Sequence, residues 1–492
     1  MKSSLNIRLI LVILSVVSLI LSCSMLIGLI ISLIYAEKNM TNIFLLLLLV
    51  FAGAGCIVFR ISRKGIKSET IKIRDGIVAV TLCWVFAAVL GTLPYLMAGT
   101  HNSFIDAFFE STACITTTGA TLIDNFAELP KSLLFWRQLT SWFGGIGIVI
   151  FAITIIPLFG FGSANLASAE STIQTLEKIQ SRATDTVRTI VLFFLVLTGA
   201  EVLLLLAGGI GVFDAFVLTF SSMGNGGFAS YQADALLQSS LYVEVIIGVF
   251  CVIAALSFVS YQLLLKGRIR DFFKEFEIRT YLIMIGIVCA LVFIILYSAN
   301  VYETAGDTVR YGVYQTISFV TTAGYSVTDT NVWPQATHWL LMAVMIVGGC
   351  SGSTSGGIRV VRAAVAFSAI RRMLYRKLHP NAVLAVRLGD RVVPEERVTS
   401  IMTFMIVYAL IVMLSCFVLS FDNIDGETTL SAVIAMISNT GLVLGPGIGF
   451  GEPLTVFSQF SRLYMSVLMI AGRLELFTIV LLFTPVFWRA NK

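Results

Sequence analysis

Four short clusters of glycine and small polar residues recur along the sequence and have side chains and backbone suited to binding an ion. They read Thr-Thr-Thr-Gly-Ala at 116–120, Gly-Asn-Gly-Gly-Phe at 224–228, Thr-Thr-Ala-Gly-Tyr at 321–325 and Ser-Asn-Thr-Gly-Leu at 438–442, and we call them tips 1 to 4. Aligned on one glycine each, they make Gly119, Gly226, Gly324 and Gly441 equivalent, at intervals of 107, 98 and 117 residues. Such regular spacing indicates an internal repeat.

The tips have the composition of a site for a hard metal cation. Glycine readily adopts the backbone conformations that turn successive carbonyl oxygens to one side, where they can replace the hydration shell of an ion. The small neighbours add hydroxyl or amide oxygens, and no tip contains Lys or Arg. One such cluster alone would be interpreted as a turn, whereas four predict a selectivity filter for K⁺ or a similar alkali cation. The predicted ligands, mostly backbone carbonyls, are Thr117, Thr118, Gly119, Gly224, Asn225, Gly226, Thr322, Ala323, Gly324, Asn439, Thr440 and Gly441.

Composition and hydropathy predict that a membrane surrounds these tips. The 492 residues are 57% hydrophobic and 12% charged, with a mean hydropathy of +0.93, which excludes a soluble globular protein. Two long apolar spans come first, at 9–35 and 42–60. After them a long span, a half-length apolar segment and a second long span recur four times. These segments are 76–98, 104–116 and 133–158, then 185–208, 212–224 and 241–265, then 279–299, 311–322 and 337–370, and lastly 398–420, 428–439 and 459–488.

Basic residues predict the orientation of these spans. Lys and Arg gather at 60–74, 178–188, 266–279 and 371–397, and the positive-inside rule assigns all four groups to the cytoplasm. Because two long spans and one half-length segment separate successive groups, each half-length segment must enter and leave on the outer side. Re-entrant backbone is tolerated only inside protein or beside a wet cavity, so we expect the tips to converge on one axis.

The predicted fold is therefore an all-α membrane protein. Four pseudo-repeats of helix, pore helix with loop, and helix surround one pore as in K⁺ channels, and two extra transmembrane helices precede them. The expected divisions are the two N-terminal helices in 1–70 and repeats at 71–175, 176–270, 271–390 and 391–492.

Acidic residues dominate the segments assigned to the outer side. An acidic vestibule would concentrate cations and repel anions, whereas ordinary loop solubility would explain the same excess. We consider Glu110, within a half-length segment, instead as a residue that holds the tip. The acidic residues are Asp106, Glu110, Asp124, Glu128, Asp214, Asp234, Glu303, Asp307, Asp329, Asp422, Asp425, Glu427 and Glu452, and the outer basic residues are chiefly Lys38, Lys131 and Arg310.

The second long span of the third repeat contains a run of small residues that predicts a broken helix. Glycine at this density is costly in a continuous helix, so we expect an intramembrane loop below the tips. Such a loop is suited to gating, and the alternative is a close-packed surface of small residues. The predicted gating residues are Gly348, Gly349, Ser351, Gly352, Ser353, Thr354, Ser355, Gly356 and Gly357.

Arg473 lies in the middle of the last span, where an ionisable residue suggests function. Pointed into the pore, its charge would form a barrier to cations, and the alternative is a structural tie between repeats through carbonyl oxygens. Glu475, two positions away, lies on a different helix face, which argues against a local pair. Glu201, also within a span, is interpreted as a packing or pairing residue.

Other chemistry is not indicated. The eight cysteines form no C-x-x-C pair and the three histidines do not cluster, so no disulfide framework and no metal site outside the filter is expected. The chain lacks a Walker-type loop and a strand-borne G-x-G-x-x-G, so we expect no nucleotide bound to it and no enzymatic activity. The first apolar run continues to about Tyr35, which favours a retained helix over a secretion signal.

Several motifs together resemble the TrkH branch of the Trk/Ktr/HKT superfamily over nearly the whole chain. The two extra N-terminal spans favour TrkH over the shorter KtrB type. The motifs are Phe-Glu-Ser at 109–111 with Thr-Thr-Thr-Gly-Ala-Thr at 116–121, Trp-Phe-Gly-Gly-Ile-Gly at 142–147, Gly-Ser-Thr-Ser-Gly-Gly-Ile-Arg-Val-Val-Arg at 352–362, His-Pro-Asn-Ala-Val at 379–383 and Gly-Arg-Leu-Glu at 472–475.

The resemblance implies K⁺ uptake across the bacterial inner membrane, with Na⁺ passage in some members. It also implies a homodimer with one pore per protomer and a cytosolic, TrkA-like nucleotide-binding subunit that docks on the basic inner face and acts on the intramembrane loop. The predicted topology places both termini in the cytoplasm. Asn225 in tip 2, and the continuation Leu442-Val443-Leu444 at the end of tip 4, depart from the usual family pattern, which bears on the K⁺/Na⁺ ratio.

Three hypotheses follow for the activity. The first is a gated channel, and the alternative is a secondary transporter that couples K⁺ to H⁺ or Na⁺ by alternating access (symport). Such transporters usually contain inverted repeats, whereas all four repeats here share one orientation, which favours the channel. The third is a non-conducting scaffold.

Overall fold

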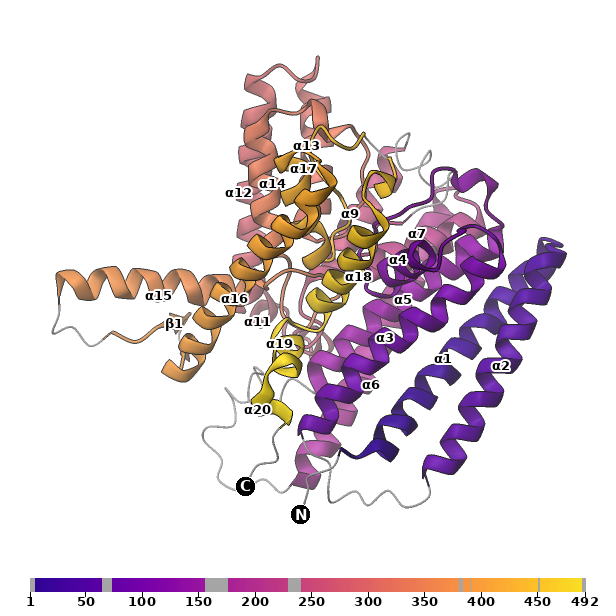
Figure 1. Cartoon of the computed structure of the whole chain (residues 1–492). Helices are drawn as coiled ribbons and strands as arrows, with labels where there is room; N and C mark the ends of the chain where they lie inside the picture. Colours follow the sequence, from indigo (N-terminus) through magenta and orange to yellow (C-terminus); the bar gives the residue numbers. More distant parts are fainter. Residues whose placement is uncertain are drawn as a thin grey trace.

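A computed structural model describes residues 5–63, 73–154, 176–228, 240–379, 384–389, 391–449 and 452–488. Within these residues the chain is almost entirely helical, as predicted (Figure 1). The exception is a pair of two-residue antiparallel strands, β1 (Arg387–Leu388) and β2 (Arg391–Val392). The basic residues Lys64, Lys67 and Lys72, the predicted span end at 155–158, Asp234 and residues 380–383 of one family motif lie outside the described residues.

Two long helices form a hairpin at the N-terminal end. They are α1 (Ile7–Ile34) and α2 (Lys38–Arg63), and the Ser18 hydroxyl donates a hydrogen bond to the Phe51 carbonyl across their interface, at 3.0 Å. Both helices expose large apolar residues on their outer faces, as expected of helices that lie against lipid rather than water.

After this hairpin, the order long helix, short helix, tip and further helix occurs four times. We call these segments units 1 to 4. Unit 1 contains α3 (Ile73–Met97), α4 (Phe104–Ile115), η2 (Phe126–Glu128) and α5 (Lys131–Thr154). Unit 2 contains α6 (Leu176–Ala207), α7 (Val212–Gly224), α9 (Leu241–Ala255), α10 (Tyr261–Leu265) and α11 (Ile269–Lys274). Unit 3 contains α12 (Phe276–Ser298), α13 (Ala305–Val320), η5 (Thr330–Val332), α14 (Gln335–Val347) and α15 (Val360–Leu378). Unit 4 contains α16 (Glu395–Leu419), η6 (Ser420–Asp422), α17 (Gly426–Ile437), η7 (Leu454–Val456), α18 (Gln459–Arg473), α19 (Phe477–Phe483) and α20 (Pro485–Trp488).

Six helices among the described residues are long and apolar enough to cross a membrane: α1, α2, α3, α6, α12 and α16. The half-length segments are confirmed as short helices. The predicted second spans of units 2 and 4 are wrong as continuous helices: α9 ends at Ala255 and α18 ends at Arg473, each followed by a break. The break predicted in unit 3 is confirmed, because α14 ends at Val347 and α15 begins at Val360.

Contacts of α1 give the direction in which the chain runs from α3 to α5. At the start of α1, the Asn6 N–H donates to Asp75, beside the start of α3, at 3.1 Å. Beyond the other end, Glu37 accepts the Lys131 N–H at the start of α5, at 2.7 Å. The chain from α3 to α5 therefore runs once, in net terms, along the length of α1. Since α3 is about 37 Å long and α4 only about 18 Å, α3 accounts for that run, in agreement with the predicted re-entry of α4.

The short helices carry N-terminal signals that explain where they begin. Ser103, Thr304 and Asp425 accept hydrogen bonds from backbone N–H groups in the first turns of α4, α13 and α17. Each of the four has an acidic residue in its first turn, which suits the positive end of a helix dipole: Asp106, Asp214, Asp307 and Glu427. Their position at helix starts explains why these four acidic residues occur among the segments assigned to the outer side. An acidic vestibule stays a prediction.

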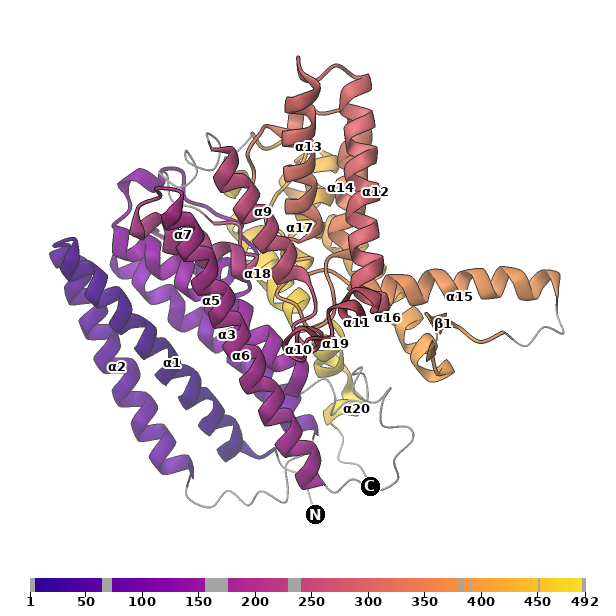
Figure 2. The ribbon, with the colours of Figure 1, turned by 180° about the vertical axis from the view of Figure 1, so that it is seen from behind.

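Helix α15 projects sideways from the other helices in both views (Figures 1 and 2). It packs beside α16, but its outer part exposes an apolar stripe. The exposed residues are Phe367 (72%), Ile370, Met373, Leu374 and Leu378 (78%).

Candidate ion pathway

The four tips share one backbone conformation. Thr117, Asn225, Thr322 and Asn439 all have positive φ angles, of 54°, 53°, 55° and 52°. Two residues later a glycine with positive φ follows in each tip: Gly119, Gly227, Gly324 and Gly441. A repeated left-handed conformation at non-glycine residues is costly, so the surrounding contacts must hold it in all four places.

This register corrects the sequence alignment of tip 2. The Gly226 N–H donates to the carbonyl five residues earlier, Ser221, as the Thr118 N–H donates to Ala113 in tip 1. Gly226 is therefore equivalent to Thr118, and Gly227 to Gly119. Gly224, predicted as a ligand, is the last residue of α7, and the equivalent triplet is 225–227. The adjacent glycines of tip 2 made the choice ambiguous from sequence.

The tips contact one another in a closed cycle. A Cβ on Gly119 would lie 2.6 Å from the Gly226 carbonyl oxygen, and a Cβ on Gly227 would lie 2.4 Å from that of Ala323. Continuing around, a Cβ on Gly324 would lie 2.3 Å from the Thr440 oxygen, and one on Gly441 would lie 2.1 Å from the Thr118 oxygen. Each glycine thus abuts the middle carbonyl of the next tip, in the order 1, 2, 3, 4 and back to 1. No side chain fits at these positions without displacing backbone.

A second cycle of contacts joins the starts of the helices around the tips. In each case the helix that follows one tip meets the short helix of the next unit. Lys131 of α5 lies over the Phe213 ring of α7, and Glu244 of α9 pairs with Arg310 of α13. His338 of α14 lies 2.5 Å from Glu427 of α17, and Arg462 of α18 lies 2.7 Å from Asp106 of α4.

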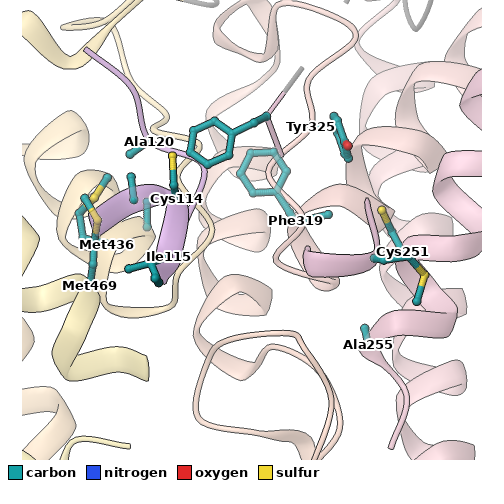
Figure 3. Packing of buried hydrophobic residues seen from close by; sticks show 14 of the residues in the cluster. Cys114, Ile115, Ala120, Cys251, Ala255, Phe319, Tyr325, Met436 and Met469 are labelled. Atoms are coloured by element: carbon teal, nitrogen blue, oxygen red, sulfur yellow. The ribbon is translucent and has the colours of Figure 1, made fainter. Parts of the chain in front are cut away.

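Apolar residues from all four units pack behind the tips. Figure 3 shows Cys114, Ile115 and Ala120 of unit 1, Cys251 and Ala255 of unit 2, Phe319 and Tyr325 of unit 3, and Met436 and Met469 of unit 4. This packing surrounds the polar tip backbone with a dense, buried wall.

Glu110 holds tip 1, as the sequence suggested. It is fully buried in α4 and accepts the Leu122 N–H at 3.0 Å and the Thr121 hydroxyl. Its partner is Arg137 of α5, also buried, whose Nε donates to the Glu110 carboxylate at 2.7 Å. Arg137 was not predicted as a site residue, because one arginine near the start of a span resembles an interfacial residue.

The loop between α14 and α15 lies against the tips. The Asn225 amide of tip 2 donates to the Thr354 hydroxyl at 3.0 Å, and the Gly356 N–H donates to the Thr322 hydroxyl of tip 3 at 2.7 Å. A Cβ on Gly356 would lie 1.8 Å from the carbonyl oxygen of Ser438, the first residue of tip 4. The loop also rests on the broken end of α9, because the Cys350 N–H donates to the Ala255 carbonyl at 2.9 Å.

Two buried arginines bind this loop. Arg473 is 2% exposed, and its Nη1 donates to the Thr354 carbonyl at 2.8 Å. Its Nε and Nη2 have no hydrogen-bond partner among the described residues. Arg359, at the loop's end, donates to the Ser355 carbonyl and has a positive φ of 79°, a strained conformation outside glycine. No role for Arg359 itself was predicted from the sequence.

Glu475 and Glu201 are the two acidic residues that were considered from the sequence within long spans. Glu475 pairs with Arg362 of α15 rather than with its neighbour Arg473. Glu201, predicted as a packing or pairing residue, is fully buried and accepts a hydrogen bond from Ser222 at 2.5 Å. Among the described residues, no group of His, Cys, Asp or Glu is arranged to hold a metal, so oxygen from backbone and hydroxyl groups is the donor chemistry available at the tips.

The fold defines an all-helical membrane protein with several apolar spans, and comparisons with known proteins specify its family. Residues 39–489 match the TrkH family, described as cation transport proteins. The TrkH potassium uptake protein of the Trk system from Halomonas elongata is 33% identical, over 98% of this chain and 100% of that protein. Its counterpart from Escherichia coli K12 is 34% identical, over 85% of this chain and 87% of that protein. The crystal structure of the potassium transporter TrkH from Vibrio parahaemolyticus superposes with a TM-score of 0.87 at 31% identity, covering 98% of this chain and 100% of that one.

This chain belongs to the TrkH family of cation transport proteins. The family is one of transporters and not of enzymes, as expected from the sequence.

Proposed function

We propose that this protein takes up K⁺ across the bacterial inner membrane, as the membrane subunit of a Trk-type system, through a gated pore whose filter is formed by the four tips. The single observation that carries the proposal is the cycle in which each tip glycine abuts the middle carbonyl of the next tip. The relatives named as potassium uptake proteins support the choice of ion.

The proposed filter ligands are the carbonyls of residues 117–119, 225–227, 322–324 and 439–441. A ring of carbonyls can replace the hydration shell of K⁺, and the buried walls keep the ring from collapsing around the smaller Na⁺. The units that supply these tips are the proposed pseudo-repeats: 71–175, 176–270, 271–390 and 391–492, after the N-terminal pair in 1–70.

The proposed gate combines the loop at 348–357 with Arg473. The loop lies against tips 2, 3 and 4, and Arg473 donates to its Thr354 carbonyl. A guanidinium held at this depth repels cations, so conduction requires both the loop and the arginine to move away.

We further propose a homodimer and a cytosolic, TrkA-like nucleotide-binding partner. Helix α15 projects from the other helices and exposes its apolar stripe (Figure 2). Contact with a second copy of the chain would bury that stripe, which supports the homodimer. The basic residues of the same helix, Arg371, Arg372, Arg376 and Lys377, suit an acidic surface of the partner.

A symporter is the second candidate, because the helices that follow tips 2, 3 and 4 are all broken. Broken helices near the middle of the bilayer also build the sites of secondary transporters. Unitary current steps support the channel, and flux that always moves H⁺ or Na⁺ in fixed ratio with K⁺ supports the symporter.

The test of the proposed function uses Gly119→Ala, with Gly286→Ala as the matched control. Gly119 has a φ of 87° and no room for a Cβ, whereas a Cβ on Gly286 of α12 would meet nothing within 4 Å. We expect purified wild-type protein and Gly286→Ala to pass K⁺ in a planar bilayer, and Gly119→Ala to lose at least about nine-tenths of the current, since strain and displaced backbone both disturb the filter. Wild-type K⁺ flux that Gly119→Ala leaves intact in folded protein contradicts the proposal.

A further inference from the structure

The N–H group three residues after the tip glycine is held in the same way in several units. In unit 1, the Leu122 N–H donates to Glu110, at 3.0 Å, and in unit 3 the Val327 N–H donates to Gln315, at 3.4 Å. Glu110 and Gln315 stand at the same position, nine residues before the tip glycine. The short helix thus fixes the segment that leaves the tip.

In unit 4 the N–H group three residues after the tip glycine is also held by the short helix, from a residue ten positions before that glycine. The Leu444 N–H donates to the Ser431 hydroxyl of α17 at 2.6 Å. The corresponding residue of unit 2, Ser230, lies outside the described residues. In the three units where this group is described, a side chain of the short helix holds the same N–H.

Unit 1 differs because its holding group is an acid paired with an arginine. Glu110 is 0% exposed and Arg137 is 1% exposed. A neutral amide performs the same holding in unit 3, so holding the N–H does not by itself require a charge. The buried ion pair must serve something more, since burying two charges is costly.

The extra contact of Arg137 reaches the next tip. Its guanidinium carbon lies 3.9 Å from the centroid of the Phe228 ring, directly after Gly227 of tip 2. The same guanidinium lies 4.9 Å from the Phe126 ring in the segment after tip 1. One side chain therefore connects the segments that leave two neighbouring tips, through cation–π contacts that burial strengthens.

Resting on the proposed pore function, we propose that Glu110 and Arg137 form a positioning pair that sets the discrimination between K⁺ and Na⁺. Glu110 fixes the exit of tip 1, and Arg137 transmits that position to Phe228 of tip 2. The pair keeps these two tips at the separation that suits K⁺. Loss of the pair lets the tips relax inward, which favours the smaller Na⁺.

The test compares Glu110→Gln with the double variant Glu110→Gln/Arg137→Met. Gln keeps the amide–backbone contact seen in unit 3 but releases Arg137, whereas the double variant also removes the charge left unpaired in a buried site. Glu244→Gln is the matched control, because Glu244 also pairs with an arginine, Arg310, but that pair joins α9 to the short helix α13 rather than two segments that leave tips.

The measurements are the reversal potential in mixed K⁺ and Na⁺ and the thermal unfolding temperature. We expect both Glu110 variants to lower the K⁺/Na⁺ permeability ratio about fivefold, a typical size for a coupling through packed residues. We expect the double variant to unfold at a higher temperature than Glu110→Gln, while Glu244→Gln keeps the wild-type ratio.

The outcomes separate this inference from the proposed function. If the wild type does not conduct, the proposed function fails. If the wild type conducts and the double variant keeps its ratio, or Glu244→Gln changes the ratio equally, the pair is structural only and the inference is overturned. A wild type that conducts K⁺ and Na⁺ alike also overturns it.

Discussion

At the scale of single residues, the arginines that contact the tips or the loop at 348–357, and Arg362 beside that loop, differ in the group that neutralises each charge. Arg137 meets the carboxylate of Glu110, and Arg362 meets Glu475. Arg473 instead meets a carbonyl oxygen, with two of its nitrogens unpartnered among the described residues. A carbonyl dipole offsets less charge than a carboxylate does, so the field of Arg473 remains to act on a nearby cation.

Replacing this arginine should therefore raise cation flux. We expect Arg473→Ala to increase K⁺ current through purified protein about tenfold, since a unit charge a few ångströms from the path costs a cation at least that factor. Arg473→Lys is the control, because it keeps the charge and should keep the low flux. If the alanine variant folds and conducts at the wild-type rate, Arg473 is a structural tie and not a barrier.

Residue patterns in the sequence indicated where the tips lie, but not which side chains elsewhere in the chain contact them. Runs of glycine and threonine indicate unusual backbone locally, so the tips, the loop at 348–357 and Arg473 were accessible from the sequence. Gly226 was aligned with the tip glycines in place of Gly227, because tip 2 contains three glycines that satisfy the same pattern. Arg137 and Arg359 act through tertiary contacts, and nothing in their neighbouring sequence indicates those contacts.

At the scale of elements, the loop between α14 and α15 is a strained insert held by many weak contacts. It bonds to tip 2, to tip 3 and to the broken end of α9, yet its own backbone forms no helix. The pair of Arg362 and Glu475 joins the start of α15 to the turn directly after Arg473. A displacement of α15 would therefore reach both parts of the proposed gate together.

Shortening the loop should open the pore. We expect deletion of residues 352–356 to raise the open probability several-fold, because the deletion removes the Thr354 carbonyl that binds Arg473 and the contacts with tips 2 and 3. Single-channel recording measures this, and Ser355→Ala provides a milder test, since it removes only the hydroxyl contact with Thr322 at 3.0 Å. A deletion variant that unfolds at the wild-type temperature but never opens would argue against a gating role.

The helix breaks show where element prediction is limited. In unit 3 the glycine run indicates its break, whereas α9 ends at Ala255 before Leu-Ser-Phe-Val-Ser, which contains neither Gly nor Pro. That end is set by the loop, whose Cys350 and Thr354 N–H groups bind the carbonyls of Ala255 and Ala254. A tertiary contact of this kind leaves no local pattern to detect.

At the scale of the whole molecule, two cycles of contacts run through the four units in the same order. One joins the starts of the helices around the tips, and the other joins the tips themselves. Hydropathy and charge predicted that the short helices re-enter and that the tips converge. The order around the axis follows from chain connectivity, because each helix that follows a tip leads directly into the next unit.

The central claim is that main-chain oxygens of the four tips together hold a dehydrated cation. Crystals grown with Tl⁺ in place of K⁺ test it directly, because Tl⁺ resembles K⁺ in size and scatters anomalously. We predict an anomalous peak about 3 Å from the carbonyl oxygens of Thr118, Gly226, Ala323 and Thr440, and its weakening in Gly119→Ala. Saturating Tl⁺ bound elsewhere, with no peak among these four oxygens, would contradict the claim.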